Sequence, residues 1–264
     1  MSIWESLLLG VLQGISEFLP ISSSGHLVLG QSLLGLDVAE LKSFDVMVHL
    51  GSLLAILLYF RNDVLELLKG LLKLLKGKFE DEYVKLIGLI SLATIPAVFA
   101  GLFLGDTIDY WFRNVTAVAL WMVTIGVIFL LGEKLSDQKE KNNWWRSVLI
   151  GCAQAFALIP GISRSGSTIV MGLFTGMKRE DAARFSFLLG IPAILGAGVL
   201  TFKDGFSEVG IVSPEIMAVG FVSSAVAGYI SVSFLMRFLR SNGLNVFAYY
   251  LIFIGILSFS VDKF

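Results

Sequence analysis

Two short polar stretches interrupt an otherwise strongly apolar chain, and they hold the residues best suited to chemistry. The first, from Gln13 to His26, reads QGISEFLPISSSGH. Gln13 and Glu17 are four residues apart, so they share one helix face. Pro20 ends that helix because it has no N–H donor and clashes with the preceding turn. A second helix is expected to begin near His26, and serines and free backbone N–H groups at a helix start predict an anion site.

The second stretch, residues 159–168, reads IPGISRSGST and repeats the pattern with one addition, Arg164. A guanidinium has the planar fork of donors that suits phosphate. If the two loops meet, they form one site with several hydroxyls and one cation. The expected substrate-binding residues are Gln13, Ser22, Ser24, Gly25, Ser163, Ser165, Gly166 and Thr168.

Structural roles compete with these functional ones. A serine in a membrane helix often bonds the carbonyl four residues earlier or caps a break. Glu17 and Arg164 are harder to explain in this way, since an ionisable group at membrane depth costs at least about 2.5–3.5 kcal/mol; the structural alternative is a buried salt bridge between the loops. His26 could be a cap or a packed core residue, and His49 is interpreted as packing or supporting the site.

The composition indicates which elements hold these two loops in place. The 264 residues are 56% hydrophobic and 16% charged, with a mean hydropathy of +0.82. Apolar segments near 20 residues recur, each long enough to cross a bilayer core of about 30 Å. This predicts an all-α polytopic membrane protein, and the net charge of −1 argues against nucleic acid as a partner. The expected spans are 44–61, 86–104, 115–133, 182–201, 214–236 and 245–261.

Segments 3–35 and 144–176 are also apolar, but each is broken by one polar loop and predicts a re-entrant helix–loop–helix hairpin. At an offset of 141 residues the two segments are copies, as Gln13 and Gln154 illustrate. The chain is therefore predicted to be one membrane domain (1–264) built from two repeats, about 1–136 and about 142–264. Each repeat has three spans, and because three is an odd number the second copy must be inserted with the opposite orientation. Such an inverted repeat predicts a site where the broken elements meet near the midplane.

Charge predicts the orientation. Most lysines and arginines lie in 61–85, 134–146, 177–184 and 237–243, so the positive-inside rule places these loops in the cytoplasm and both termini outside. Residues 64–78 show leucines at helical spacing with lysines between them. They predict an amphipathic helix on the cytoplasmic surface.

EFLPISSSGH and PGISRSGST together resemble the bacterial undecaprenyl-diphosphate phosphatase family, also called the bacitracin-resistance protein family. The resemblance covers nearly the whole chain. It implies a multi-pass enzyme of the bacterial plasma membrane that removes one phosphate from undecaprenyl diphosphate at the outer face. It also implies help from Mg²⁺ or Ca²⁺, which we expect to arrive with the substrate, and no organic cofactor. The implied catalytic residues are Glu17, Ser23, His26 and Arg164.

In that scheme Ser23 is the nucleophile, through a phosphoserine intermediate, with direct attack by water as the alternative. His26 would move a proton, while Glu17 has three candidate roles: base, orienter of His26, or ligand of a divalent cation. The rival function is a polyprenyl-phosphate transporter or flippase, because inverted repeats with re-entrant hairpins are transporter architecture. The expected partners are the lipid and the membrane, and a homodimer is compatible with the sequence.

Overall fold

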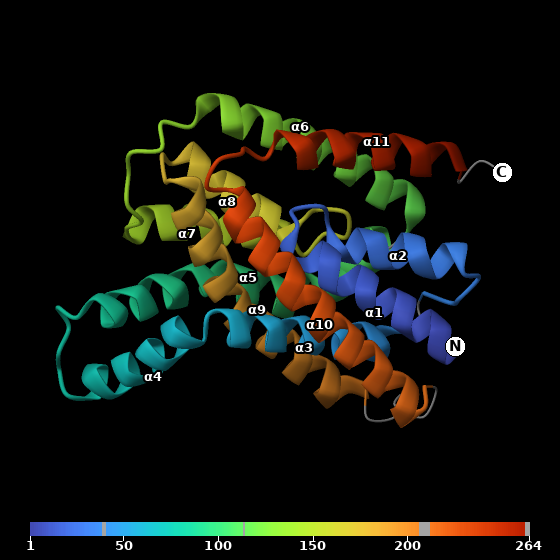
Figure 1. Ribbon diagram of the computed structural model, residues 1–264, viewed down its shortest axis with the longest axis horizontal. Coiled ribbons are helices and arrows are strands. Elements are labelled where there is room, and N and C mark those ends of the chain that lie inside the picture. Colours follow the sequence, from blue (N-terminus) through green and yellow to red (C-terminus); the bar gives the residue numbers. More distant parts are fainter. Residues whose placement is uncertain (39–40, 113, 206–211, 262–264) are drawn as a thin grey trace.

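The computed structural model describes residues 1–38, 41–112, 114–205 and 212–261, which fold into a bundle of helices (Figure 1). The predicted all-α class is confirmed within these ranges. The helices are α1 (Ile3–Phe18), α2 (Ser23–Leu33), α3 (Lys42–Tyr59), α4 (Arg61–Leu75), α5 (Glu82–Phe112), α6 (Val115–Leu135), α7 (Trp144–Phe156), α8 (Arg164–Phe174), α9 (Arg179–Gly205), α10 (Pro214–Phe238) and α11 (Asn245–Val261).

Both predicted breaks are present, between α1 and α2 and between α7 and α8. The expected start of the second helix near His26 is wrong, because α2 already begins at Ser23. The Ser22 side chain accepts a hydrogen bond from the Gly25 backbone N–H and so caps the helix three residues earlier. At 1.5 Å per residue, α1 and α2 each fall short of the roughly 30 Å of a bilayer core.

Five helices of the described chain are long and apolar enough to cross a membrane, so the protein is an integral membrane protein with several spans. They match five of the six expected spans; the sixth, α11, is a shorter apolar helix. The qualifying segments are Lys42–Tyr59, Glu82–Gly105, Val115–Leu135, Arg179–Val199 and Pro214–Phe238. The amphipathic helix is present as α4, which packs against α5.

The helices pack in a few close pairs that bury the end of α1. α1 lies against α10, α3 against α9 and α10, α7 against α5, and α6 against α11 (Figure 1). Gly14 allows the closest contact of α1 with α10, since a Cβ there would lie 2.4 Å from the Ser224 carbonyl oxygen. Phe18 packs edge-on against Phe187, with ring centroids 5.6 Å apart. The last turn of α1 is thereby held inside the bundle.

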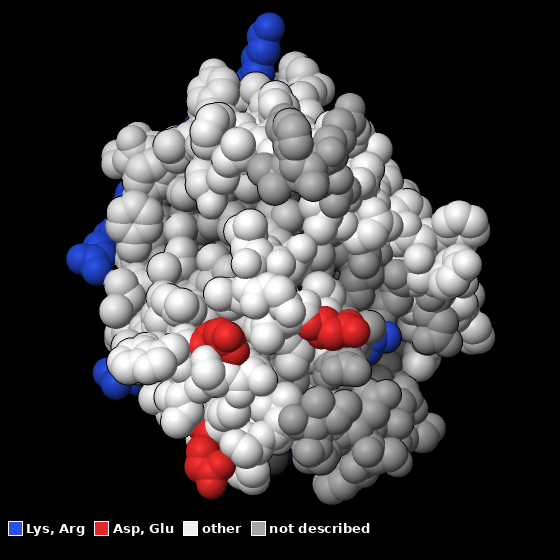
Figure 2. Space-filling model, turned by 90° about the vertical axis from the view of Figure 1, so that its right-hand side faces the viewer, with Lys and Arg blue, Asp and Glu red and all other residues white. Residues whose placement is uncertain are grey.

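Charged side chains are unevenly distributed over the molecule. The start of α1 and the end of α11 lie at one end, and the lysine-rich hairpin of α4 and α5 protrudes from the other (Figure 1). Figure 2 shows the first of these ends: acidic groups lie on the face, and most of the visible Lys and Arg side chains lie at its edge. Few Lys or Arg side chains are therefore visible on the face of the end that holds the N-terminus.

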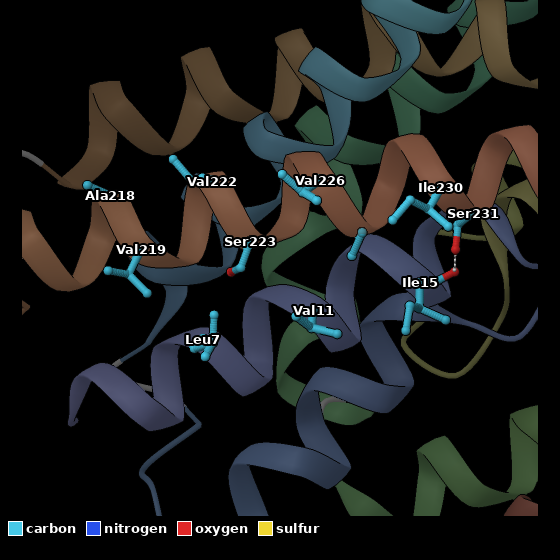
Figure 3. A pocket seen from close by; sticks show the side chains of 11 residues that line it. Leu7, Val11, Ile15, Ala218, Val219, Val222, Ser223, Val226, Ile230 and Ser231 are labelled. Atoms are coloured by element: carbon cyan, nitrogen blue, oxygen red, sulfur yellow. Dashed lines mark hydrogen bonds between the residues drawn. The ribbon is translucent and has the colours of Figure 1, made fainter.

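A second surface feature is an apolar groove of about 740 Å³ between α1 and α10. In Figure 3, Leu7, Val11 and Ile15 of α1 face a row of aliphatic side chains on α10. Gln13 and Glu17 lie on the opposite side of α1, because they are offset from Ile15 by two residues in a helix of 3.6 residues per turn. The groove is therefore separate from the polar site.

Candidate active site

Glu17, in the last turn of α1, is the centre of the polar cluster. Its side chain is only 5% exposed. Its Oε2 accepts hydrogen bonds from Ser23 Oγ at 2.6 Å and from Gln13 Nε2 at 3.0 Å. Its Oε1 accepts one from Arg164 Nη2 at 2.5 Å. The two broken loops, 147 residues apart between Glu17 and Arg164, thus meet at one carboxylate.

Ser23 and Arg164 are the first residues of α2 and α8, so each side chain projects at a helix N-terminus. Ser22 precedes α2 with φ of 72°, a left-handed conformation that is uncommon for a residue with a Cβ. Ser163 caps α8 by accepting the Gly166 N–H at 3.1 Å. Backbone N–H groups at both helix starts favour an anion between them.

The two loops touch directly through glycine. A Cβ added to Gly25 would lie 3.3 Å from the Gly161 Cα, and Gly161 has φ of 95°, which suits glycine. The predicted convergence of the two loops is therefore present. Ser165 and Thr168 lie behind the second loop: Thr168 Oγ1 donates to the Arg164 carbonyl at 2.8 Å, and Ser165 Oγ lies 3.4 Å from Ser163 Oγ.

The Arg164 guanidinium is held on two sides. Nη1 donates to the Ser186 carbonyl of α9 at 3.2 Å, and Nη2 donates to Glu17. Gly190 of α9 leaves the space the guanidinium needs, since a Cβ there would lie 2.1 Å from Nη1. The side chain remains 16% exposed. A guanidinium has five N–H donors, so this geometry leaves others for a ligand.

These groups line a cavity of about 330 Å³. Its polar lining residues are Glu17, Ser23, Ser24, Asp45 and His49, with two cations, Lys42 and Arg164. Its apolar lining residues include Leu27, Val28, Val46, Ala157, Leu158, Ile162, Ala193, Ile194 and Ala197. A cavity that combines cations and hydroxyls with aliphatic side chains suits a phosphorylated hydrocarbon.

His26 does not face this cavity, although the sequence places it next to Ser23 as a catalytic candidate. Its Nδ1 lies 2.8 Å from the Ser22 carbonyl oxygen and must donate to it, since a carbonyl only accepts. Its Nε2 lies 2.8 Å from the Tyr250 hydroxyl of α11, and the two rings stack. This buried side chain therefore braces the loop that carries Ser23.

The comparison with known proteins decides the family. A family model described as bacitracin resistance protein BacA matches residues 6–257. The chain belongs to this family. Proteins named undecaprenyl-diphosphatase from Rubrobacter xylanophilus and Alcanivorax borkumensis are 42% and 40% identical over 253 and 256 residues, covering 93% and 96% of each chain. One from Methanosphaera stadtmanae is 39% identical over 273 residues, covering 98% of this chain and 97% of the relative. The BacA match includes both polar loops.

His49 of α3 is the cavity residue whose position the sequence left open. Its Nε2 lies 3.7 Å from Glu17 Oε2, and its side chain is 28% exposed. The spacing of Asp45, His49 and Ser52 marks one face of α3, and that regular spacing is the only signal in the sequence that could have placed it. Asp45 also lines the cavity, and its Oδ1 accepts a bond from Gln31 Nε2 at 2.6 Å.

The hydrogen bonds around Glu17 indicate whether its carboxylate could hold the divalent cation that the family resemblance implies. Both carboxylate oxygens already accept hydrogen bonds, and a guanidinium occupies one of them. Within the described residues no group of three or more His, Cys, Asp or Glu side chains could hold a metal ion. This arrangement does not fit Glu17 as a ligand of a resident ion.

Proposed function

We propose that this BacA-family protein is a membrane-embedded phosphatase that converts undecaprenyl diphosphate into undecaprenyl phosphate, the lipid carrier of cell-wall synthesis. The relatives named undecaprenyl-diphosphatase support the substrate. The observation that carries the proposal is the Glu17 carboxylate, which accepts from the Ser23 hydroxyl and from the Arg164 guanidinium at the edge of a half-apolar cavity. In phosphoryl transfer a serine can act as the nucleophile, an adjacent carboxylate as its base, and a cation can stabilise the developing charge.

In the proposed reaction, Ser23 Oγ attacks the terminal phosphorus and its proton passes to Glu17 Oε2, 2.6 Å away. The bond to the bridging oxygen breaks, undecaprenyl phosphate leaves, and a phosphoserine remains. Water then attacks that phosphorus. Glu17 returns its proton to Ser23 Oγ as the serine bond breaks, and both protons of the water leave with inorganic phosphate.

Charge stabilisation is the main task of the surrounding groups, because phosphoryl transfer depends chiefly on positioning and electrostatics. Arg164 supplies the fixed cation, and the N-termini of α2 and α8 add backbone N–H groups. The apolar wall of the cavity receives the first part of the hydrocarbon. A divalent cation would arrive as the counter-ion of the diphosphate, and phosphate release with and without a chelator measures that requirement.

We also infer an inverted repeat with six spans: α3, α5, α6, α9, α10 and α11. The packing supports this inference. In such a repeat α1 is equivalent to α7, and α5 is equivalent to α10. α1 packs against α10 and α7 packs against α5, so the same contact is made twice. α11, with 17 residues, is at the short end of the spanning range. The α1–α2 and α7–α8 segments would be the re-entrant hairpins of repeats one and two.

The cavity is proposed to open to the outer face of the plasma membrane. Lys42, the first residue of α3, lines it, and α3 runs from the end shown in Figure 2 toward the α4–α5 hairpin. The hairpin end carries the lysines that the positive-inside rule assigns to the cytoplasm. The opposite end, with the cavity mouth, then faces outward.

The test is phosphate release from undecaprenyl diphosphate by the purified protein. Ser23→Ala should abolish it, whereas Ser16→Ala should stay within a few-fold of wild type, because Ser16 Oγ bonds the Leu12 carbonyl of its own helix. The rival function, a lipid transporter, needs no nucleophile. A wild-type protein that releases no phosphate, yet moves polyprenyl phosphate across vesicles in both wild-type and Ser23→Ala forms, would replace the enzyme with a carrier.

A further inference from the structure

His49 is a titratable side chain that faces the cavity and has no part in the reaction proposed above. Its Nδ1 lies 2.6 Å from the Asp45 carbonyl oxygen. A carbonyl oxygen has no hydrogen to donate, so Nδ1 carries the proton in that bond. Nε2 is therefore the nitrogen that gains or loses a proton, and it is the one that points toward Glu17 and the cavity.

The groups around Nε2 determine what a proton there would do. Glu17 approaches from α1 and Arg164 lies beyond it on α8, while Lys42 and Asp45 line the cavity from α3 itself. The cavity-lining residues of α9 are aliphatic or glycine. On the other side of α3, α10 contributes a neutral contact, Ser224 Oγ to the Val48 carbonyl.

A diphosphate entering this cavity would place a second acceptor beside His49. Nε2 would then lie between the Glu17 carboxylate and phosphate oxygens, all of which accept hydrogen bonds and carry negative charge. Only a protonated Nε2 can donate to them. Histidine is the side chain that ordinarily changes charge between pH 5 and 8.

We propose that His49 is a substrate-binding residue that donates from protonated Nε2 to the diphosphate, beside Arg164, so that diphosphate binding takes up a proton. The proposal rests on the proposed function for the choice of diphosphate. It gives the site a further cation beside Arg164 and Lys42, which is present only while Nε2 is protonated. The reaction itself still depends on Ser23 and Glu17.

The experiment measures binding, so it does not depend on turnover. The probe is a prenyl methylenediphosphonate, in which carbon replaces the bridging oxygen and hydrolysis is blocked. Its Kd is measured by calorimetry for wild type and His49→Gln between pH 5.5 and 8.0. The probe's own protonation affects both proteins equally, so the ratio of the two Kd values isolates His49. Repeating the titrations in buffers of different ionisation heat counts the protons taken up.

We expect His49→Gln to bind about ten-fold more weakly at pH 5.5, from the loss of one charge-assisted hydrogen bond, and to approach wild type at pH 8. The variant should also take up fewer protons. His26→Gln, which changes the histidine outside the cavity, should keep the wild-type pH dependence. A Kd ratio that stays constant across the series would overturn the proposal and leave His49 as a partner of Glu17 alone. Absence of phosphate release with intact binding would instead reject the phosphatase.

Discussion

Glu17→Gln is the most informative single change, because one carboxylate accepts from the serine, the arginine and Gln13. The substitution keeps the shape of the side chain and removes its charge. Its NH₂ group would face a donor at one of the two oxygen positions, either the Ser23 hydroxyl or the Arg164 guanidinium. The Ser23 proton then loses an acceptor of sufficient basicity, while the rest of the cavity keeps its form.

The size of the loss follows from what the carboxylate does. A positioned general base contributes about 10²–10⁴-fold to rate. With Ser23 Oγ 2.6 Å from the carboxylate, the full effect applies. We expect kcat to fall by about 10³, equivalent to about 4 kcal/mol of transition-state stabilisation. Gln13→Ala removes a hydrogen bond at 3.0 Å and leaves the base in place, so it should cost less than ten-fold.

The assay is release of labelled phosphate by Glu17→Gln, Ser23→Ala and the double variant, each checked for an unchanged thermal transition in detergent. Residues that act as one unit show strongly non-additive losses. The double variant should therefore be no slower than Ser23→Ala. Additive losses, or a Glu17→Gln protein with more than about a tenth of wild-type kcat, would refute the proton transfer between these two side chains.

Three further changes test the supports of the site. Gly190→Ala places a methyl 2.1 Å from Arg164 Nη1, and the displaced guanidinium should lower kcat/KM at least ten-fold. The control is Gly196→Ala, whose methyl meets no atom within 4 Å and should leave phosphate release near wild type. Tyr250→Phe removes the donor to His26 Nε2 and should lower stability by about 1–3 kcal/mol with less than ten-fold loss of activity; a loss as large as that of Glu17→Gln would return His26 to the chemistry. Gly14→Ala sets a methyl 2.4 Å from the Ser224 carbonyl oxygen and should destabilise the protein by about 1–3 kcal/mol, measured as a lower melting temperature, while Gly88→Ala, with open space around it, should show no such decrease.

The breaks and most spans could be predicted because their causes are local. Pro20 ends α1 for reasons contained in the proline ring, and apolar length alone marks five spanning helices. Boundaries were less predictable. α2 begins earlier than expected because of a side-chain cap at Ser22, and α5 extends to Phe112, beyond the expected end at 104, because helix formation is not limited to the part that lipid must cover.

The roles of the two histidines could not be separated from sequence, because long-range contacts decide them. His26 is three residues from Ser23, yet Tyr250, 224 residues away, holds its ring outside the cavity. His49 is far from both loops in the chain, and it reaches Glu17 only because α3 and α1 pack side by side. Short motif spacing predicted which residues cluster around Glu17, but it contained no information on which ring nitrogen faces the substrate.

The offset of 141 residues gives the two loops different parts of one reaction. Ser23 and Arg164 are equivalent under that offset, and each is the first residue of its helix, where backbone N–H groups are free. Glu17 corresponds to Leu158, so only the first copy retains a carboxylate, and that carboxylate bonds both helix-start residues. Two identical copies would bring together either two hydroxyls without a cation or two like charges. In the proposed reaction, the differences at these two positions therefore supply a nucleophile, a base and a cation for one phosphate.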